Sequence, residues 1–457
     1  MLRDKSLEEL ASIVGGENLL TSREELLCYG YDAQHIEGLP DAIVVPRSTE
    51  EVAGVLRLAN RERIPVVPRG AGTGLSGGSV PARGGIVLLL RKMDKVLKID
   101  KGELYAVVQA GVVNKDLNDM LVPLGLFYPP DPASYRTSTL GGNIATNAGG
   151  PHTLKYGVTR DYVLGLEVVS PTGEIYRTGA LTVKSVSGYD MTSLLVGSGG
   201  TLGVITEATL RLLPRPEHTE TMTASFPAIR KAAEAVTAIL ASGITPSTLE
   251  LMDRTTINVV EDFKHLGLPR EAEALLLVET DGPRRRAEEE AAAAAMICRG
   301  LGADVKSATS TEERERLWEG RRAALPALAR LKPTTILEDV TVPRTRIPEM
   351  LEAIWRITRK EGIEVGVFGH AGDGNLHPTF LVDERDGEEM GRVERAVEEM
   401  FMVALGLGGT LSGEHGIGLT KARFLELERG KEGIEVMRRI KRALDPNDIL
   451  NPGKVFP

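Results

Sequence analysis

Two glycine-rich motifs in the second half of the chain bring together side chains that bind divalent metals. His370 and His377 flank the segment AGDGNL, and Glu414 and His415 are adjacent in the motif SGEHGIG. Two imidazoles and a carboxylate are a typical ligand set for zinc, manganese or iron, and they leave positions open for a chelating substrate. Because six residues separate the two histidines, one helical turn cannot pair them, and the glycines must fold the chain. The alternative is that the histidines are surface residues held in glycine-rich turns.

The other histidines lack such neighbours, and we expect ordinary surface or core positions for them. One of them, His152, lies close to a glycine-rich stretch. These histidines are His35, His152, His218 and His265.

A glycine-rich loop, VVPRGAGTGLSGG at residues 66–78, follows a predicted strand and could bind an anion. It matches both the dinucleotide fingerprint and the hydrolase nucleophile elbow, but both motifs require a helix to start at the loop. Pro81 and a strand-like run at 86–90 follow instead, which disfavours both readings. Apart from a plain surface turn, the remaining interpretation is a loop whose backbone N–H groups approach a diphosphate, helped by Thr73, Ser76 and Arg69.

The elements around this loop indicate a layered α+β protein. A strand at 41–46, a helix at 48–63 and a strand at 64–68 form a βαβ unit whose exit is the loop. Further glycine-rich stretches lie at 137–150 and 197–203, and prolines 214 and 216 indicate a boundary. The second half alternates longer helices with strands near 219–226, 247–252, 273–280 and 334–342. This alternation predicts helices on one face of an antiparallel sheet.

Composition excludes several classes of protein. The chain of 457 residues carries a net charge of −9, which disfavours non-specific binding to nucleic acid or anionic membranes. Its only cysteines, Cys28 and Cys298, cannot form a disulfide framework or hold an iron–sulfur cluster by themselves. No apolar run approaches the roughly 20 residues of a membrane helix, and the first residues read as an amphipathic helix rather than a signal peptide. We expect a cytoplasmic protein that could attach to the inner membrane through partners.

The loops PRGAGTGLSGG, TSTLGGNIATNAGG and GSGGTLGVIT together resemble the FAD domain of the vanillyl-alcohol-oxidase (PCMH) type of flavoprotein. With FGHAGDGNLHPTF and SGEHGIG, the chain resembles the D-2-hydroxyacid dehydrogenase branch. That branch includes D-lactate dehydrogenases and the FAD subunit of glycolate oxidase. SGEHGIG and the segment ALDPNDILNPGKVF look closest to the latter, and the resemblance covers residues 40–457.

The resemblance implies an α+β fold in three segments. Residues 1–39 would be a helical lead-in, and residues 40–215 a two-subdomain FAD-binding domain of the PCMH type. Residues 216–457 would form an α+β substrate and metal domain with a ferredoxin-like antiparallel sheet, whose C-terminal helices return to the flavin.

The implied cofactor is non-covalent FAD. Some relatives attach FAD to a histidine in the first loop, but no histidine lies between Val66 and Gly78. The first loop would hold the pyrophosphate, the second would line the path to the isoalloxazine, and the third would close over the adenine. The expected FAD-binding residues are Arg69, Gly70, Ala71, Gly72, Thr73, Gly74, Ser76, Gly77, Pro132, Thr137, Ser138, Thr139, Gly141, Gly142, Ala145, Asn147, Gly149, Gly203, Val204, Ile205 and Asn451.

The implied activity is oxidation of a short D-2-hydroxy acid, glycolate to glyoxylate or D-lactate to pyruvate, by hydride transfer to flavin N5. His370, His377 and Glu414 would bind the metal, which lowers the pKa of the substrate hydroxyl. His415 would accept the hydroxyl proton, although the roles of Glu414 and His415 could be reversed. Arg321 matches the arginine that pairs with the substrate carboxylate, unless its charged helix is simply solvated.

The resemblance also has implications for the size of the substrate and for the electron acceptors, and two alternative functions remain. Leu337 and Thr379 stand where relatives that oxidise dicarboxylates carry polar or basic groups, which favours a monocarboxylate. Electrons would pass to a quinone carrier or to partner subunits, namely a second FAD-domain subunit and an iron–sulfur subunit. A homodimer is also compatible with the sequence. The alternatives are a metallohydrolase with a nucleotide-binding N-terminal domain, and a catalytically silent flavin-binding subunit that serves assembly.

Overall fold

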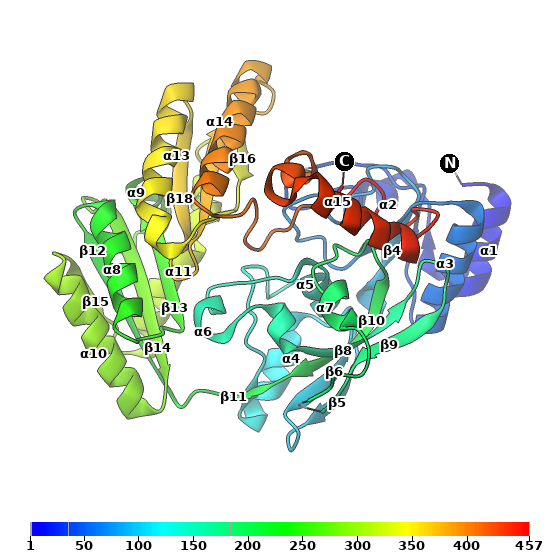
Figure 1. The fold of residues 1–457 in the computed structure, drawn as a ribbon, viewed down its shortest axis with the longest axis horizontal. Coiled ribbons are helices and arrows are strands. Elements are labelled where there is room, and N and C mark those ends of the chain that lie inside the picture. The colour runs from blue at the N-terminus through cyan, green and yellow to red at the C-terminus, as the bar shows by residue number, and fades with distance from the viewer. Residues whose placement is uncertain (1, 35, 183, 457) are drawn as a thin grey trace. The chain divides into compact units, whose positions relative to one another are not determined.

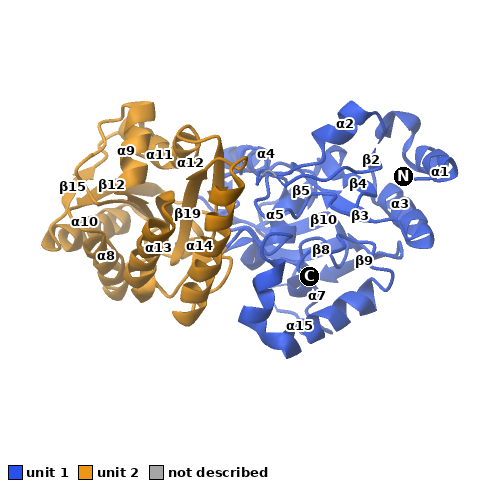
Figure 2. Ribbon diagram, turned by 90° about the horizontal axis from the view of Figure 1, so that it is seen from above, with its two compact units in different colours: residues 1–149, 157–215, 414–457 blue, residues 150–156, 216–413 orange. Residues whose placement is uncertain are grey.

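The computed structural model describes residues 2–34, 36–182 and 184–456, so His35 lies outside the described residues. The chain forms two compact units (Figure 2). Unit 1 contains residues 1–149, 157–215 and 414–457, and unit 2 contains residues 150–156 and 216–413. The chain therefore passes between the units four times.

The first sheet of unit 1 contains the predicted βαβ unit. Its strands run in the order β1 (Leu19–Leu20), β2 (Ala42–Val44), β4 (Ile86–Leu89) and β3 (Val66–Arg69). β2 and β3 both pair in parallel with β4, and helix α3 (Thr49–Glu62) connects β2 to β3. The Ser48 side chain caps α3 by accepting a hydrogen bond from the Glu51 N–H. The first glycine loop leaves the carboxyl end of β3, as the sequence predicts.

The second sheet of unit 1 is antiparallel and carries the other two glycine loops. Its order is β5 (Val96–Asp100), β6 (Tyr105–Gln109), β10 (Val204–Arg211), β8 (Val163–Val169) and β9 (Ile175–Gly179). The second glycine loop forms a helix, α5 (Leu140–Thr146), which the sequence reading did not expect. Thr139 caps α5 by accepting a hydrogen bond from the Gly142 N–H. Other elements of unit 1 include α1 (Asp4–Val14), α2 (Arg23–Cys28), α4 (Asn114–Leu121), α7 (Met191–Leu195), β7 (Leu126–Phe127) and β11 (Leu213–Pro214).

The C-terminal helix α15 (Leu425–Leu444) and the segment after it belong to unit 1. The buried Lys441 ammonium donates to the carbonyls of Thr201, 2.9 Å away, and Leu450, 2.8 Å away. Residues 449–451 then run beside β3, because Val66 N–H donates to Ile449 and Asn451 N–H donates to Val66. This return places the LNPGK motif next to the first glycine loop.

Unit 2 is built on one antiparallel sheet (Figure 1). The strand order is β15 (Asp304–Ser307), β12 (His218–Phe226), β14 (Ala274–Gly282), β13 (Thr248–Asp253), β18 (Glu364–His370), β19 (Asn375–Val382) and β16 (Thr334–Leu337), and β17 (Val340–Thr341) also pairs with β19. The structure confirms the predicted strands at β12, β13 and β14, and it divides the one expected at 334–342 into β16 and β17. The sequence reading assigned no strand to the His370–His377 motif, which lies in β18 and β19.

Helices cover both faces of this sheet, whereas the sequence suggested one face. Figure 2 shows the two groups on opposite sides of the strands. One group contains α8 (Ile229–Ala241), α10 (Arg284–Gly300), α13 (Ile347–Glu361) and α14 (Gly387–Gly406). The other group contains α9 (Arg254–Lys264), α11 (Thr311–Arg322) and α12 (Ala324–Leu328). The short α6 (Thr153–Tyr156), from the segment 150–156, also belongs to unit 2.

Candidate cofactor cavity and histidine pair

The first glycine loop of unit 1 is held from behind by the segment around Asp32. The Asp32 carboxylate accepts a hydrogen bond from Gly77 N–H at 2.6 Å, and Ala33 N–H donates to the Gly74 carbonyl at 3.1 Å. Burial raises the pKa of Asp32, and backbone hydrogen bonds from Gln34 and Gly77 offset part of that rise. These two hydrogen bonds support the loop from the side of the Asp32 segment.

Arg69 supports the same loop. Its guanidinium donates to the carbonyls of Tyr31 at 2.8 Å and Ser79 at 3.2 Å. A Cβ added at Gly72, where φ is +74°, would lie 2.1 Å from Arg69 Nη2. Glycine at position 72 is therefore needed both for the backbone conformation and for the close approach of the guanidinium.

The glycine loops of unit 1 line one cavity, and most of the expected FAD-binding residues lie in its wall. The expected residues that line it are Arg69, Gly70, Ala71, Gly72, Thr73, Gly74, Ser76, Pro132, Ser138, Thr139, Gly141, Gly142, Ala145, Gly203, Val204, Ile205 and Asn451. Those outside its lining are Gly77, Thr137, Asn147 and Gly149. Lining residues that the sequence reading did not select for FAD include Leu75, Gly78, Leu90, Ala110, Asn143, Gly199 and Gly200.

The cavity wall fits a ligand that brings hydrogen-bond acceptors. The Ser138 hydroxyl, the Asn143 amide nitrogen and Arg69 Nε are buried without a hydrogen-bond partner among the described residues. Buried donors are normally satisfied, so unpaired donors in a cavity wall indicate a missing partner. Gly74 and Gly78 add open space, because a Cβ at either position would meet no atom within 4 Å. Phosphate, ribityl and isoalloxazine oxygens of FAD would satisfy such donors.

The LNPGK motif joins two glycine loops at this cavity. The Asn451 amide donates to the Gly199 carbonyl at 2.7 Å, and the Lys454 ammonium donates to Gly78 and to Asn451 Oδ1, both at 2.8 Å. Burial lowers the pKa of Lys454 to about 7, although the charge of Asp32 acts in the opposite direction. Asn451 thus lines the cavity and also holds the first and third loops together.

The SGEHGIG motif reaches the same cavity, where both Glu414 and His415 line the wall. The Ser76 hydroxyl donates to the His415 carbonyl at 3.0 Å, and Leu419 N–H donates to the Ser76 carbonyl at 2.7 Å. A Cβ at Gly418 would lie only 2.0 Å from that carbonyl. The motif is therefore packed against the first glycine loop, which positions a carboxylate and an imidazole at the cofactor cavity of unit 1.

His370 and His377 come together in unit 2 through a hairpin. The register of β18 and β19 pairs Phe368 with His377 and His370 with Asn375, so the two histidines lie on one face as diagonal neighbours. Their ring centroids are 5.2 Å apart and both side chains are buried. Gly374 allows the turn, because its φ is +80° and a Cβ would lie 2.0 Å from the Val342 carbonyl. Strand pairing, rather than a loop alone, brings the imidazoles together.

Each of these imidazoles faces a buried carboxylate through its Nδ1 atom. His370 Nδ1 is 2.6 Å from Glu250 Oε1, and His377 Nδ1 is 4.0 Å from Asp339 Oδ1. Asp339 in turn accepts hydrogen bonds from Asn375 and Ser412, each at 2.6 Å. A histidine whose Nδ1 is hydrogen-bonded to a carboxylate presents Nε2 as the metal ligand, a common arrangement in metal sites. His370 meets this condition, whereas the distance from His377 to Asp339 is that of an ion pair only. The sequence reading missed both carboxylates.

Arg321 belongs to the same cluster of unit 2. Its Nη2 and Nε atoms lie 2.6 and 2.7 Å from Glu250 Oε2, and its guanidinium lies 4.7 Å from the centroid of the Phe368 ring. Burial acts to raise the pKa of Glu250, but the charges of His370 and Arg321 outweigh it and hold that pKa below its usual range. The helix α11 is therefore not simply a solvated charged helix at this position.

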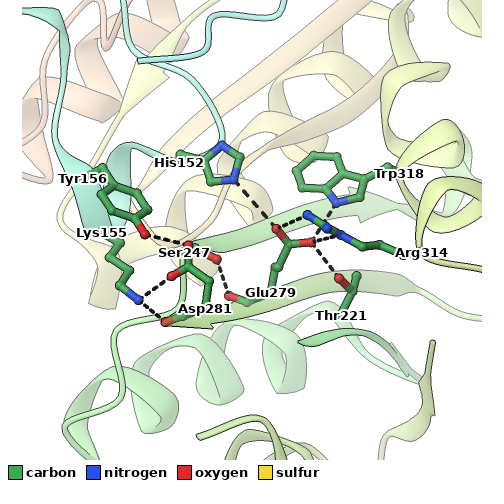
Figure 3. Close-up of polar contacts among 9 residues, drawn as sticks. All are labelled: His152, Lys155, Tyr156, Thr221, Ser247, Glu279, Asp281, Arg314 and Trp318. Atoms are coloured by element: carbon green, nitrogen blue, oxygen red, sulfur yellow. Dashed lines mark hydrogen bonds and ion pairs between the residues drawn. The ribbon is translucent and has the colours of Figure 1, made fainter. Parts of the chain in front are cut away.

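A second polar network lies on the same helix and sheet (Figure 3). The buried Glu279 carboxylate accepts hydrogen bonds from Thr221, Trp318 and Arg314, and His152 Nε2 lies 3.8 Å away. Burial opposes ionisation of Glu279, but contacts with His152 and Arg314 lower its pKa to about 2.

The neighbouring Asp281 carboxylate extends this network along β14. It pairs with Lys155 and accepts a hydrogen bond from the Tyr156 hydroxyl at 2.6 Å. Together with the contact of His152 to Glu279, these bonds attach the segment 150–156 to the sheet of unit 2.

Comparisons with protein families and with named proteins show to which family the chain belongs. Residues 40–179 match a family described as FAD binding domain, and residues 215–455 match FAD linked oxidases, C-terminal domain. The glycolate oxidase subunit GlcD of Bacillus subtilis is 50% identical over 98% of this chain and 96% of its own. The D-lactate dehydrogenase of Archaeoglobus fulgidus is 42% identical over 90% of both chains. The mitochondrial cytochrome-type D-lactate dehydrogenase of Arabidopsis thaliana is 35% identical over 96% of this chain and 79% of its own.

Solved structures share the fold at low identity. A p-cresol methylhydroxylase with bound substrate superposes with a TM-score of 0.80 at 18% identity, over 99% of this chain and 96% of its own. An alkyldihydroxyacetonephosphate synthase superposes with a TM-score of 0.77 at 22% identity, over 99% of this chain and 86% of its own. This likeness confirms the expected α+β fold of the PCMH type. Among the described residues, no helix combines the length and the apolar character needed to span a bilayer.

Proposed function

Because this chain belongs to the family of FAD-linked oxidases, we propose that it oxidises a short D-2-hydroxy acid, either glycolate or D-lactate. The observation that carries the proposal is the presence of Glu414 and His415 in the wall of the cofactor cavity. An acid–base pair beside the cofactor is what removal of a hydroxyl proton requires. Relatives named as a glycolate oxidase subunit and as D-lactate dehydrogenases support the choice of substrate class.

FAD supplies the two-electron acceptor, and a divalent cation supplies a Lewis acid. The first glycine loop, which contains no histidine, holds FAD without a covalent bond. His415 accepts the proton of the substrate hydroxyl. His370, His377 and Glu414 hold zinc, manganese or iron, and the pairing of the two buried imidazoles in the β18–β19 hairpin supports this set.

Arg321 binds the substrate carboxylate. Its Nε and Nη2 atoms are engaged by Glu250, and Nη1 lies outside that pairing. A guanidinium held by a buried carboxylate and a phenyl ring loses little conformational freedom when it binds an anion. Leu337 and Thr379 are buried, uncharged side chains, which supports a monocarboxylate substrate.

Electrons taken up by the bound FAD would pass to other molecules. The chain has two cysteines, too few to hold an iron–sulfur cluster by themselves. The name of the Bacillus subtilis relative as a subunit supports partner proteins, for which we propose a second FAD-domain subunit and an iron–sulfur subunit. A quinone is the alternative acceptor.

An anaerobic substrate screen tests the proposal. The FAD-loaded protein is mixed with glycolate, D-lactate, L-lactate or 3-hydroxybutyrate, and the visible flavin absorbance is followed with and without a chelator. We expect bleaching by glycolate or D-lactate, and we expect the chelator to slow it. A flavin that none of these acids bleaches would contradict the proposed substrate class and favour a catalytically silent subunit.

A further inference from the structure

We propose that Glu250 is a positioning residue, which fixes the imidazole of His370 and the guanidinium of Arg321 relative to each other. This inference rests on the proposed function, because it gives one metal ligand and the carboxylate-binding cation a common support. Neither the motif around His370 nor the helix that carries Arg321 contains Glu250, which lies in the middle of β13.

The sheet places Glu250 next to His370 without help from any loop. The register of β13 and β18 pairs Glu250 directly with His370, so their side chains point to the same face. The Glu250 side chain is 1% exposed, and its neighbours on β13, Leu249 and Leu251, are buried too. A carboxylate in such a position is stable only when it is fully paired, and here both oxygens have partners.

One oxygen of Glu250 determines the tautomer and the ring orientation of His370. Oε1 lies 2.6 Å from His370 Nδ1 and accepts its N–H. A proton on Nδ1 leaves the lone pair on Nε2, which is the atom available to a metal. The same hydrogen bond restricts rotation of the ring. Glu250 therefore selects both the tautomer and the orientation that a metal ligand requires.

The other oxygen of Glu250 fixes Arg321. Oε2 accepts from both Nε at 2.7 Å and Nη2 at 2.6 Å, and the guanidinium lies over the Phe368 ring. Because one carboxylate holds both groups, their separation is set by its own width. A 2-hydroxy acid carries its hydroxyl and carboxylate on adjacent carbons, so it needs a cation and a metal close together. Glu250 thereby favours 2-hydroxy acids over 3-hydroxy acids.

The chain contains a matched control in Glu279. This residue lies on the neighbouring strand β14, is equally buried, and pairs with Arg314 and Trp318 of the same helix α11 (Figure 3). Glu279 has no contact with His370 in any hydrogen bond or ion pair that the described residues form. A change at Glu279 therefore alters the contacts between the sheet and helix α11 without removing a bond to the proposed metal ligand.

The test compares Glu250→Gln with Glu279→Gln in the full-length, FAD-loaded protein. Binding of Mn²⁺ and Zn²⁺ to metal-stripped protein is measured by calorimetry, and kcat and KM are measured for the acid that bleaches the flavin. We expect the metal Kd of Glu250→Gln to rise roughly 10- to 100-fold, as for other residues that support a ligand. KM should rise as well, and discrimination against 3-hydroxybutyrate should decrease. The Kd of Glu279→Gln should stay within about twofold of wild type.

A double variant covers the case in which Glu250→Gln does not fold, because it leaves the Arg321 charge buried without its partner. In Glu250→Gln/Arg321→Met both charges are removed, and the metal Kd should still rise. Arg321→Met alone should raise KM but leave the metal Kd near wild type, because Glu250 still holds His370.

The outcomes separate the two proposals. Wild-type protein that binds neither metal contradicts the metal site of the proposed function. Wild-type protein that binds metal, with an equal Kd for Glu250→Gln, overturns the role of Glu250. Equal weakening by Glu250→Gln and Glu279→Gln would also overturn it, since a general loss of structure would then explain the effect.

Discussion

Replacement of Gly74 by alanine separates what the fold requires of the first glycine loop from what the cofactor requires. A Cβ at Gly74 would meet no atom within 4 Å, and its φ lies outside the left-handed region. The protein itself can therefore accept alanine at this position. Gly74 nevertheless lines the cofactor cavity, so the added methyl group would occupy space that FAD needs.

The magnitudes follow from two opposite effects. A glycine-to-alanine change in an unstrained position stabilises the apoprotein by about 0.4–1 kcal/mol, because the unfolded chain loses entropy. For a unit of this size that corresponds to a rise in Tm of roughly 1–4 °C. A methyl group forced into a filled site costs about 1–3 kcal/mol. At about 1.4 kcal/mol per tenfold change, the FAD Kd should rise by roughly 5- to 150-fold.

The assay measures both quantities on one preparation. Apoprotein stripped of flavin is melted by calorimetry and then titrated with FAD, whose fluorescence changes on binding. Gly16→Ala is the control, because Gly16 also has no atom within 4 Å of a Cβ and lies outside the cavity lining. It should raise Tm without changing the FAD Kd. An unchanged FAD Kd in Gly74→Ala would refute the placement of FAD against this loop, and a lower Tm would refute the account of the backbone.

Three further predictions concern unit 1. Gly418→Ala should lower Tm and remove activity together. The added Cβ would lie 2.0 Å from the Ser76 carbonyl and would displace His415, whose carbonyl accepts a hydrogen bond from Ser76. Retained activity would show that this packing is unimportant. His415→Asn should lower kcat by roughly 10²- to 10⁴-fold while the flavin stays bound, as measured by anaerobic stopped flow, and a normal rate would exclude it as the base. Because burial lowers the pKa of Lys454 from 10.5 to about 7, the folded protein holds fewer protons than the unfolded chain between these values. The free energy of unfolding of the wild type should therefore rise with pH across this window, by up to about 1.4 kcal/mol per pH unit. In Lys454→Met this rise should be smaller, as measured by urea denaturation at pH 7 and pH 9. An equal rise in both proteins would contradict the pKa shift.

Local patterns predicted much of unit 1. The strand at 64–68 and the helix that begins at Ser48 appear where their residue types indicate. The helix α5 escaped prediction because Gly141 and Gly142 have low helix propensity. The structure gives the reason for one of these glycines, since a Cβ at Gly141 would lie 2.6 Å from Ala110. Close packing, rather than propensity, determines this helix.

Long-range partners were beyond the reach of sequence patterns. Glu250 is far from His370 in the chain, and only the register of β13 and β18 makes them neighbours. A charged residue inside the apolar strand TLELMD was the available signal, because a buried acid needs a partner. Likewise, the charged helix α11 looked solvated, although Arg314 and Arg321 pair with carboxylates of the sheet.

The contribution of residues 449–454 to the first glycine loop has a consequence for biosynthesis. Asn451 and Lys454 both donate hydrogen bonds to the Gly78 carbonyl, in a loop that the ribosome releases hundreds of residues earlier. Until they emerge, β3 lacks its neighbour at Leu450 and the Gly78 carbonyl lacks the ammonium group. We therefore expect FAD to bind only after these residues have left the ribosome, so that a nascent chain arrested before Asn451 should be colourless.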